Sequence, residues 1–396
     1  MNIKIPFHQP YRLHHSAVFE LLKKTKDLNH KAIQLLREKL GLDDSYDVFL
    51  TQSATGALEM IALALELTSE DEVIMPSFTY AATANAFART GARIVFADIE
   101  PETLNLDPNS VKARMTVRTK AIVPIHYGGE AADIEQLSKL CEGTACVIIE
   151  DAAHGIGAEY KGKPLGTLGL MSAFSFHHTK NIHAGGSGGA LILNRNHSHY
   201  TEQLYESISA IYTQGTDRFA FIEGRVPAYT WQTLGGEFEM TDYSKATLMD
   251  QLMHYEAIVE RRKIIFTKYV NALKPLCEQT GLYSIAQIRK ANINTNTNTN
   301  TNNGHIFWMV FNSVEERQLI QSILSKNGIS AYTHYEPLHL STAGRLYGKT
   351  GEALPVTERI ADRLLRLPIY HELTEVQQDF IIEALQKGIM ELNGNK

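Results

Sequence analysis

The sequence predicts an α/β fold, with a large domain built on a mixed, mostly parallel sheet and a smaller α+β domain after it. Short apolar runs alternate with helical patterns from about residue 47 to about residue 195, which is typical of parallel βαβ units. A long helical stretch at about 242–273 separates these units from a second set of strand and helix patterns. Because 396 residues are enough for two domains, we expect one over residues 1–245 and another over residues 246–396 that includes the linking helix.

The first strand and the helix after it form a candidate phosphate site. The run 47–51 (DVFLT) predicts a strand, and the turn 52–57 (QSATGA) opens an apolar helix expected over 58–67. Free N–H groups at a helix N-terminus bind phosphate, and the hydroxyl of Thr55 can add a hydrogen bond. Most such turns only cap a helix, so this segment indicates a ligand site only together with others.

Two later strand ends carry further candidate residues. The strand expected at 72–76 is followed by Ser-Phe-Thr-Tyr, ending at Tyr80, and the strand expected at 146–151 ends in Asp151, with His154 three residues later. Parallel sheets bind ligands at the carboxyl ends of their strands, where an aromatic ring can stack on a flat cofactor. Each residue also has a structural interpretation, since Tyr80 and His154 could belong to the core and Asp151 could cap a helix.

The segment 175–189 (SFHHTKNIHAGGSGG) is the most informative part of the sequence. Lys180 stands five residues after Ser175 and just before a glycine-rich turn. Enzymes that use pyridoxal 5'-phosphate (PLP) need a lysine amine for the cofactor aldehyde, a hydroxyl for its phosphate and small residues that let the backbone approach. In this interpretation Asp151 pairs with the protonated pyridine nitrogen and Tyr80 stacks on the ring. Taken alone, the segment could also be a glycine-rich loop with a surface lysine.

Composition and charge exclude several other classes of function. The net charge is −6 and the basic residues are scattered, so nothing favours nucleic-acid binding. The three cysteines, Cys141, Cys146 and Cys277, form no CxxC pair. Without a signal peptide or an apolar run of membrane length, we expect a protein of the reducing cytoplasm with no membrane partner.

The expected second domain has a repeat that stands apart from its other elements. Residues 305–311 and 329–332 predict strands, and residues 314–327 predict a helix. The Asn/Thr repeat at 292–303 has little to bury, so we expect a mobile surface loop. Polar tracts of this kind can also form β ladders at high concentration.

The histidine pairs do not predict a metal site. His177 and His178 are adjacent, so in a strand they point to opposite faces, and His334 and His339 are five residues apart around a proline. Neither pair has a zinc spacing. Ordinary structural roles and a place in the substrate cleft are both open for four residues: His126, Tyr127, His334 and His339.

These segments together resemble the DegT/DnrJ/StrS family of sugar-nucleotide aminotransferases. The resemblance runs from Ile5 to about residue 368, through SEDEVIMPS (69–77), IVPIHY (122–127), FSFH (174–177), TKN (179–181) and HYEPLH (334–339). These motifs look closest to one group of the family, the dTDP-4-amino-4,6-dideoxygalactose transaminases. The resemblance implies PLP as cofactor and the fold of aspartate aminotransferase, known as fold type I.

The resemblance also implies a role for each site residue. It makes Lys180 the lysine that binds the cofactor covalently and Asp151 the partner of the ring nitrogen, so these two are the catalytic residues. The other implied cofactor contacts are the ring neighbours Tyr80 and His154 and the phosphate cradle of Thr55, Gly56 and Ser175. Asn181 is implied to be a site residue without an assigned role.

The activity implied by the resemblance is the transfer of an amino group from L-glutamate to a keto-sugar nucleotide. We favour dTDP-4-dehydro-6-deoxyglucose, aminated at C4 for lipopolysaccharide or O-antigen synthesis, by a homodimer with its active sites at the interface. Amination at C3 and a UDP-linked substrate are alternatives. A PLP-dependent sugar dehydratase of the family would have histidine in place of Lys180, and a regulatory protein would not need Lys180, Asp151 and Ser175 together.

Two segments depart from the family pattern. Relatives carry Gly-x-Asn-x-Arg-Met, where the Asn reaches the cofactor phosphate of the neighbouring subunit, but residues 235–240 read GGEFEM. Glu237 and Glu239 stand in place of Asn and Arg, and a carboxylate beside phosphate would be repulsive. In addition, the glycine-rich N-terminal loop of the family is replaced by a helical pattern at 21–30 without glycine.

Overall fold

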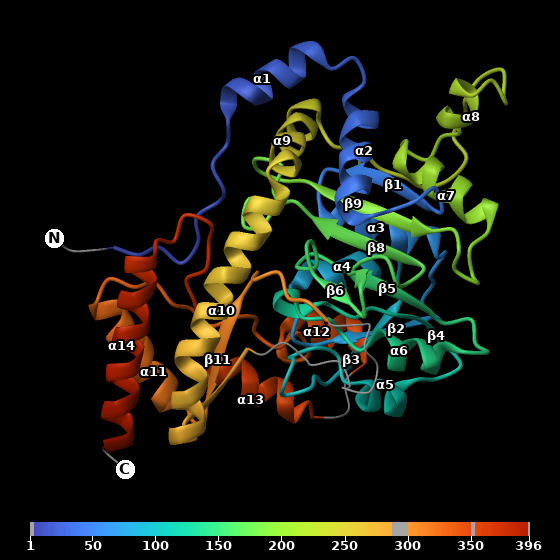
Figure 1. The fold of residues 1–396 in the computed structure, drawn as a ribbon. Helices are drawn as coiled ribbons and strands as arrows, with labels where there is room; N and C mark the ends of the chain where they lie inside the picture. Colours follow the sequence, from blue (N-terminus) through green and yellow to red (C-terminus); the bar gives the residue numbers. More distant parts are fainter. Residues whose placement is uncertain (1–3, 287–299, 350–352, 395–396) are drawn as a thin grey trace.

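A large mixed sheet forms the centre of the computed structural model, which describes residues 4–286, 300–349 and 353–394 (Figure 1). Its strands follow the order β1-β9-β8-β5-β4-β2-β3-β12. Strand β9 runs antiparallel to its neighbours β1 and β8, and the other pairs are parallel. The mixed, mostly parallel α/β sheet expected from the sequence is thereby confirmed. In chain order the strands are β1 (Tyr46–Thr51), β2 (Glu72–Pro76), β3 (Arg93–Ala97), β4 (Thr119–Ile122), β5 (Val147–Asp151), β8 (Met171–Ser175), β9 (Gly189–Asn194) and β12 (Gly348–Lys349).

Helices cover both faces of this sheet, so its inner strands are buried and read as continuous apolar runs. On one face, apolar side chains of the strands pack with α3 (Ala54–Ala64), α4 (Ala81–Ala88) and α7 (Glu202–Tyr212). On the other face, α2 (Leu28–Leu40) and α9 (Asp242–Met253) cover β1, β8 and β9. Helices α5 (Pro108–Arg114) and α6 (Ile134–Cys141) cover β2 to β5 on that same face.

Three helical segments expected from the sequence have different bounds in the structure. Helix α3 begins at Ala54, four residues before the expected start, because Ser53 Oγ accepts the Gly56 N–H at 3.0 Å and caps it. The expected long helix 242–273 is two helices, α9 and the 26-residue α10 (Tyr255–Thr280), which meet at His254. Near the N-terminus, the expected helical pattern at 21–30 is likewise divided between α1 (His15–Lys24) and α2.

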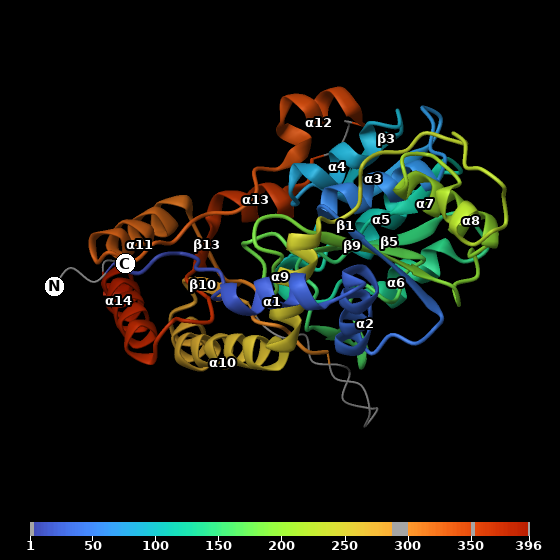
Figure 2. The ribbon, with the colours of Figure 1, turned by 90° about the horizontal axis from the view of Figure 1, so that it is seen from above.

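The smaller domain lies to one side of the large sheet (Figure 2). Strands β10 (Tyr283–Ile285), β11 (Phe307–Phe311) and β13 (Leu364–Leu367) form an antiparallel sheet. Its apolar side chains pack with α10, α11 (Val314–Lys326), α13 (Pro355–Arg363) and α14 (Glu375–Gly394). The strand expected at 329–332 is not formed. Only two isolated bridges occur there, in which Ile329 pairs with Ile5 and Tyr332 pairs with Arg366.

The end of the Asn/Thr repeat is part of the interior, contrary to the expected surface loop. Asn303 has no exposed surface, and its side-chain amide donates to the carbonyl oxygens of His154 at 2.7 Å and Ile156 at 2.8 Å. Asn300 and Asn302 are also buried. An amide side chain can be buried at little cost when its donors and acceptors are hydrogen-bonded. Composition alone does not reveal whether such partners exist. Residues 292–299 of the repeat lie outside the described residues.

The remaining elements are short. They are β6 (Glu159–Tyr160), β7 (Lys163–Pro164), α8 (Arg218–Ile222), α12 (Thr342–Tyr347) and the 3₁₀ turns η1 (Tyr127–Gly129) and η2 (Leu338–Leu340). Within the described parts of the chain, none of the helices has the length and apolar character needed to span a bilayer.

Candidate active site

A cavity of about 580 Å³ opens at the carboxyl ends of the central strands. Asp151 ends β5 and Ser175 ends the neighbouring strand β8, so both side chains reach the same edge of the sheet. The first turn of α3 forms another part of the wall. Residues from the N-terminal segment and from β13 close the opposite side, so the cavity lies between the large sheet and the smaller domain.

Asp151 is buried at the cavity and held by two hydrogen bonds. Its Oδ2 accepts the Thr83 hydroxyl at 2.8 Å, and its Oδ1 accepts the Ala153 N–H at 3.1 Å. Burial raises the pKa of the Asp151 carboxyl, while these two hydrogen bonds and the charge of Lys180 favour the carboxylate. A cationic ring nitrogen placed against it would strengthen the preference for the charged form. Asp151 is thus a positioned acceptor for a protonated ligand nitrogen.

Lys180 supplies the amine of the cavity. Its backbone N–H donates to the His177 carbonyl at 2.8 Å in the turn after β8, and its side chain lines the cavity. Burial lowers the pKa of Lys180 to about 8, against the opposing attraction of Asp151. Its ammonium forms no salt bridge with any residue that the structure describes. A lysine with a lowered pKa has more of the neutral amine that reacts with an aldehyde.

Three histidines around the cavity are kept neutral. Burial, as the largest cause, holds the pKa of His154, His305 and His334 well below the usual value. His154 Nδ1 accepts the Gly128 N–H at 3.3 Å, which in a neutral imidazole leaves the proton on Nε2. The ring of His154 lies 4.4 Å from that of His305, centroid to centroid. The cavity therefore offers polar imidazole groups without adding positive charge beside Lys180.

The part of the cavity beside the first turn of α3 is suited to bind an anion. Hydroxyl groups reach it from Ser53, Thr55, Ser175 and Ser187, beside the first turn of α3. The close approach depends on the glycine-rich turn, because a Cβ at Gly189 would collide with the backbone of Ser53 and Ala54. Hydroxyls together with a helix N-terminus form a common phosphate site.

These groups fit PLP. The cavity combines a lysine amine with a lowered pKa, a buried carboxylate for the ring nitrogen and a hydroxyl cluster at a helix N-terminus for the phosphate. Tyr80 lines the same cavity with 66% of its surface exposed, which leaves its ring free to stack on a planar ligand.

The structure brings most, but not all, of the residues selected from the sequence to this cavity. Two of the others are close behind it. Gly56 belongs to the cap of α3, and Asn181 binds the backbone oxygen of Asn303 at 3.1 Å and the ring of His305 at 2.8 Å. Asn181 thus holds the wall of the cavity and does not line it. The residues selected from the sequence that do line the cavity are Thr55, Tyr80, Asp151, His154, Ser175, Lys180 and His334.

His126 and Tyr127 have no direct access to the cavity. Glu150 points to the other side of β5 from Asp151 and is fully buried, and His126 Nε2 lies 2.8 Å from its Oε2. Alternation along a strand explains why one acid faces the cavity and its neighbour faces the interior. The hydroxyl of Tyr127 lies 2.7 Å from Nδ1 of His334, so Tyr127 supports a residue that lines the cavity.

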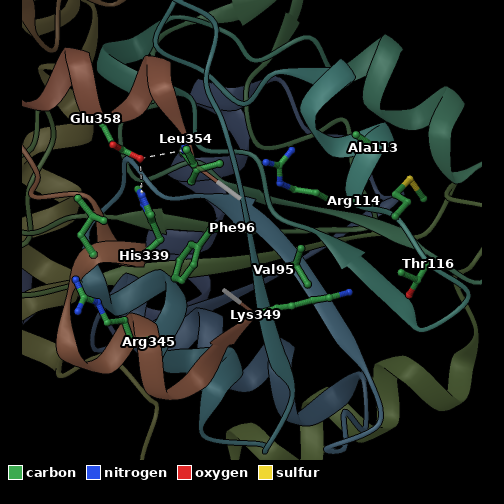
Figure 3. Close-up of a pocket in the computed structure, with 13 residues that line it drawn as sticks. Val95, Phe96, Ala113, Arg114, Thr116, His339, Arg345, Lys349, Leu354 and Glu358 are labelled. Carbon is green, nitrogen blue, oxygen red and sulfur yellow. Dashed lines mark hydrogen bonds and ion pairs between the residues drawn. The ribbon is translucent and has the colours of Figure 1, made fainter. Parts of the chain in front are cut away.

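His339 lies in a different cavity, of about 670 Å³ (Figure 3). Its Nδ1 lies 2.7 Å from Ser77 Oγ and its Nε2 lies 3.2 Å from Glu358 Oε1. Ser77 begins the segment that leads to Tyr80. His339 therefore anchors that segment from behind. The lysine that lines its cavity, Lys349, forms an ion pair at 3.2 Å with the buried carboxylate of Glu72, whereas the ammonium of Lys180 has no such partner among the described residues.

Several lining residues were not selected from the sequence, and Thr83, Arg366, Phe7 and His8 are among them. Thr83 stands one helical turn after Tyr80, so placing candidates on one helix face could have found it. Arg366 is a charged residue within the apolar run LLRLP, and its guanidinium donates to the Thr333 carbonyl at 2.8 Å. Phe7 and His8 come from the N-terminal segment, and no local pattern indicates that this segment crosses to the cavity.

The two acids that depart from the family pattern are engaged elsewhere. Glu239 forms an ion pair with Lys245 at 2.6 Å, and Glu237 accepts a hydrogen bond from the side chain of Gln214. Both are exposed. Phe238, between them, is buried close to Gly56.

Comparison with known proteins agrees with this site. The sequence matches the DegT/DnrJ/EryC1/StrS aminotransferase family over residues 36–386. It is 33% identical over 316 residues to a pleiotropic regulatory protein of Geobacillus stearothermophilus, which covers 80% of this chain and 77% of that protein.

Solved structures resemble the whole chain. The aminotransferase TlmJ from Streptoalloteichus hindustanus superposes with a TM-score of 0.84 at 25% identity, covering 98% of this chain and 99% of that chain. The PLP form of Spr1654 from Streptococcus pneumoniae superposes with a TM-score of 0.83 at 26% identity, again covering 98% of this chain and 99% of that one.

Proposed function

The chain belongs to the DegT/DnrJ/EryC1/StrS aminotransferase family and is a PLP-dependent sugar aminotransferase of fold type I, and we propose that it carries nitrogen from L-glutamate to a keto-sugar nucleotide. The observation that carries this proposal is the meeting of Lys180 and Asp151 in one cavity, beside a hydroxyl cluster suited to phosphate. Their positions along the sequence do not by themselves bring these groups together; the fold does.

Each group has a separate task in the proposed mechanism. When bound, PLP supplies an aldehyde that takes up nitrogen and a conjugated ring that spreads carbanion charge. Lys180 would hold the cofactor through its Nζ and, once displaced by the donor, take the proton from the donor α-carbon. A pKa of about 8 leaves a useful fraction of this amine neutral near physiological pH. Asp151 would keep a proton on the ring nitrogen, and Thr83 would orient that carboxylate.

For the acceptor we propose dTDP-4-dehydro-6-deoxyglucose, aminated at C4 to give a dTDP-4-amino-4,6-dideoxyhexose for surface polysaccharide. Motifs through the large and small domains support this choice, namely SEDEVIMPS at 69–77 and HYEPLH at 334–339. In the second motif, His334 lines the cavity, and His339 contacts Ser77 at the start of the segment that leads to Tyr80. Amination at C3 or of a UDP-linked 4-keto sugar is the alternative within the same chemistry.

A panel of donors and acceptors tests the proposal. Purified protein with PLP would be incubated with L-glutamate and either dTDP-4-dehydro-6-deoxyglucose, its 3-keto isomer or a UDP-linked 4-keto sugar. We expect a product one amino group richer by mass from the first acceptor, with proton NMR placing nitrogen at C4. A product only from the second or third acceptor would replace this assignment, and no product from any keto sugar would overturn the aminotransferase activity.

A further inference from the structure

Three side chains of metal-binding type meet away from the cavity, where α1 begins and α9 ends. His14 precedes α1, Asp250 lies in the last turns of α9, and His254 stands between α9 and α10. Each offers one ligand atom, and these atoms lie within 4.8 Å of one another. His14 is 236 residues from Asp250, so the cluster exists only in the folded chain.

The carboxylate at the centre of this cluster needs a positive charge. The Asp250 side chain is only 1% exposed, and His14 Nδ1 lies 3.2 Å from both of its oxygens. His254 Nδ1 lies 3.9 Å from Oδ1. Among the described residues, neither lysine nor arginine pairs with Asp250. A buried carboxylate is costly unless its charge is balanced, and a bound cation would balance it.

The geometry suits a small divalent ion with nitrogen and oxygen ligands. Zinc bonds to histidine and carboxylate are about 2.0 to 2.1 Å long, which places two tetrahedral ligands about 3.3 Å apart. The 3.2 Å distance between His14 Nδ1 and Asp250 Oδ1 is close to this value. The His254 side chain is 39% exposed, and its Nε2 would be the ligand atom. Its Nδ1 lies 2.8 Å from the Asp250 carbonyl oxygen, and donation there would leave Nε2 free to bind metal while orienting the ring.

We propose that His14, Asp250 and His254 bind one divalent transition-metal ion of the zinc class, with water as the remaining ligand. Two imidazoles and one carboxylate favour zinc, nickel or copper over magnesium and calcium, which prefer oxygen ligands. The half-exposed histidines leave room for water and for entry of the ion.

Such an ion would fix the N-terminal segment that forms one wall of the active site. Phe7 and His8 of this segment line the cavity, and the Tyr11 carbonyl accepts His183 Nε2 at 2.9 Å. The metal would fasten the far end of the segment, at His14, to the junction of α9 and α10. The metal would therefore hold this wall of the cavity in place, and it would not take part in the chemistry of Lys180.

Zinc titration of the PLP-loaded protein after dialysis against EDTA tests the site. A chromophoric chelator in competition should report one zinc ion per chain, and magnesium should not compete. His14→Ala and His254→Gln should each weaken zinc binding at least about tenfold. His199→Gln is the matched control, because His199 is an exposed histidine whose ring neighbours another histidine, His197, at 5.5 Å, and it should leave the titration unchanged.

A second measurement separates a bound metal from a simple loss of folding. Zinc should slow proteolysis within residues 4–14 of the unmodified protein and leave its rate unchanged in His254→Gln, whose substituted side chain is partly exposed and whose fold is checked by circular dichroism. Absence of zinc binding at micromolar concentrations would overturn the proposal. So would zinc binding that His254→Gln retains in full, because His254 would then not be a ligand.

Discussion

Lys180 and Asp151 show how one cavity moves an amine and a carboxyl toward their neutral forms. Burial lowers the pKa of Lys180 to about 8 and raises that of Asp151, and the attraction between the two charges only partly offsets both shifts. The protein thus stores an electrostatic cost at this site. A cationic nitrogen and a phosphate brought by a ligand would relieve that cost, which connects cofactor binding to stability.

The first prediction concerns the stability of the protein without cofactor. The pKa of Lys180 is about 8 in the folded chain and close to 10.5 when unfolded, so the unfolded state binds more protons between these values and stability rises with pH there. Lys180→Met removes this penalty. Apo Lys180→Met should therefore melt above the apo parent at pH 7, and the difference should shrink between pH 8 and pH 10.5. A variant that melts lower at pH 7 would contradict the assigned burial cost.

The second prediction assigns the covalent link. Borohydride reduction of the yellow, PLP-loaded protein followed by peptide mapping should place the pyridoxyl group on Lys180, because its amine is the lysine nitrogen that lines the cavity. Lys180→Ala should lose turnover at every pH. Lys161→Ala provides the control, since Lys161 pairs with Glu135 away from the cavity and should label and turn over as the parent does. A label on any other lysine would refute the assignment.

The third prediction concerns Asp151. Asp151→Asn should still bind PLP but lose about 3 kcal/mol or more of transition-state stabilisation, a rate loss on the order of a hundredfold. Thr83→Val keeps the carboxylate and removes its 2.8 Å hydrogen bond, so its loss should be smaller. Steady-state rates with saturating donor measure both. Near-normal turnover of Asp151→Asn would make Asp151 a structural cap.

The sequence analysis identified site residues that directly follow a strand. It missed cavity residues that are brought to the site from distant parts of the chain. Asp151 and Lys180 carry chemistry that their local pattern reveals. Arg366 and His8 reach the same cavity from the smaller domain and the N-terminal segment, and only the folded chain brings them there. His126 shows the reverse case, because its strand-end position suggested a ligand role, yet its ring is paired with buried Glu150.

At the scale of elements, the parallel core was predictable because buried strands and amphipathic helices differ in period. The break at His254 and the loss of a strand at 329–332 were not, since both depend on partners elsewhere: Ile329 pairs with Ile5, and Tyr332 with Arg366. The repeat shows the same limit. Its composition indicates a solvated loop, whereas Asn303 finds partners for its amide in the interior.

The fourth prediction uses this buried amide. Asn303→Ala would leave the carbonyl oxygens of His154 and Ile156 without their donor and the His305 N–H without its acceptor. Unpaired buried groups cost about 1 to 3 kcal/mol each, so for these three groups we expect a loss of about 3 kcal/mol or more in urea unfolding. Asn300→Ala removes an amide that accepts the Lys161 N–H and should cost less. Equal losses would show that the Asn303 contacts carry no special weight.

For the molecule as a whole, one apolar surface stands out. Helix α8 and the loop after it project from the large domain (Figure 1) and expose large apolar side chains within one segment. They are Phe221 at 42%, Ile222 at 64%, Tyr229 at 52%, Trp231 at 75% and Leu234 at 66%. Several large apolar side chains exposed in one segment are typical of an interaction site. The segment leads to Phe238, which lies close to Gly56 in the first turn of α3, so a partner bound to the segment would lie close to the active site.

The last prediction is that this segment packs against a second copy of the chain, giving a homodimer with the active sites at the interface. Sedimentation at low micromolar concentration should show a dimer, and Trp231→Lys should shift the population toward monomer because a charge would enter an apolar contact. Val376→Lys is the matched control, since Val376 is equally exposed, at 75%, on α14 of the smaller domain. If the interface also completes the active site, Trp231→Lys should lose turnover in parallel with the dimer and recover it at high protein concentration. A fully active monomer would refute this arrangement, and a dimer unaffected by Trp231→Lys would place the interface elsewhere.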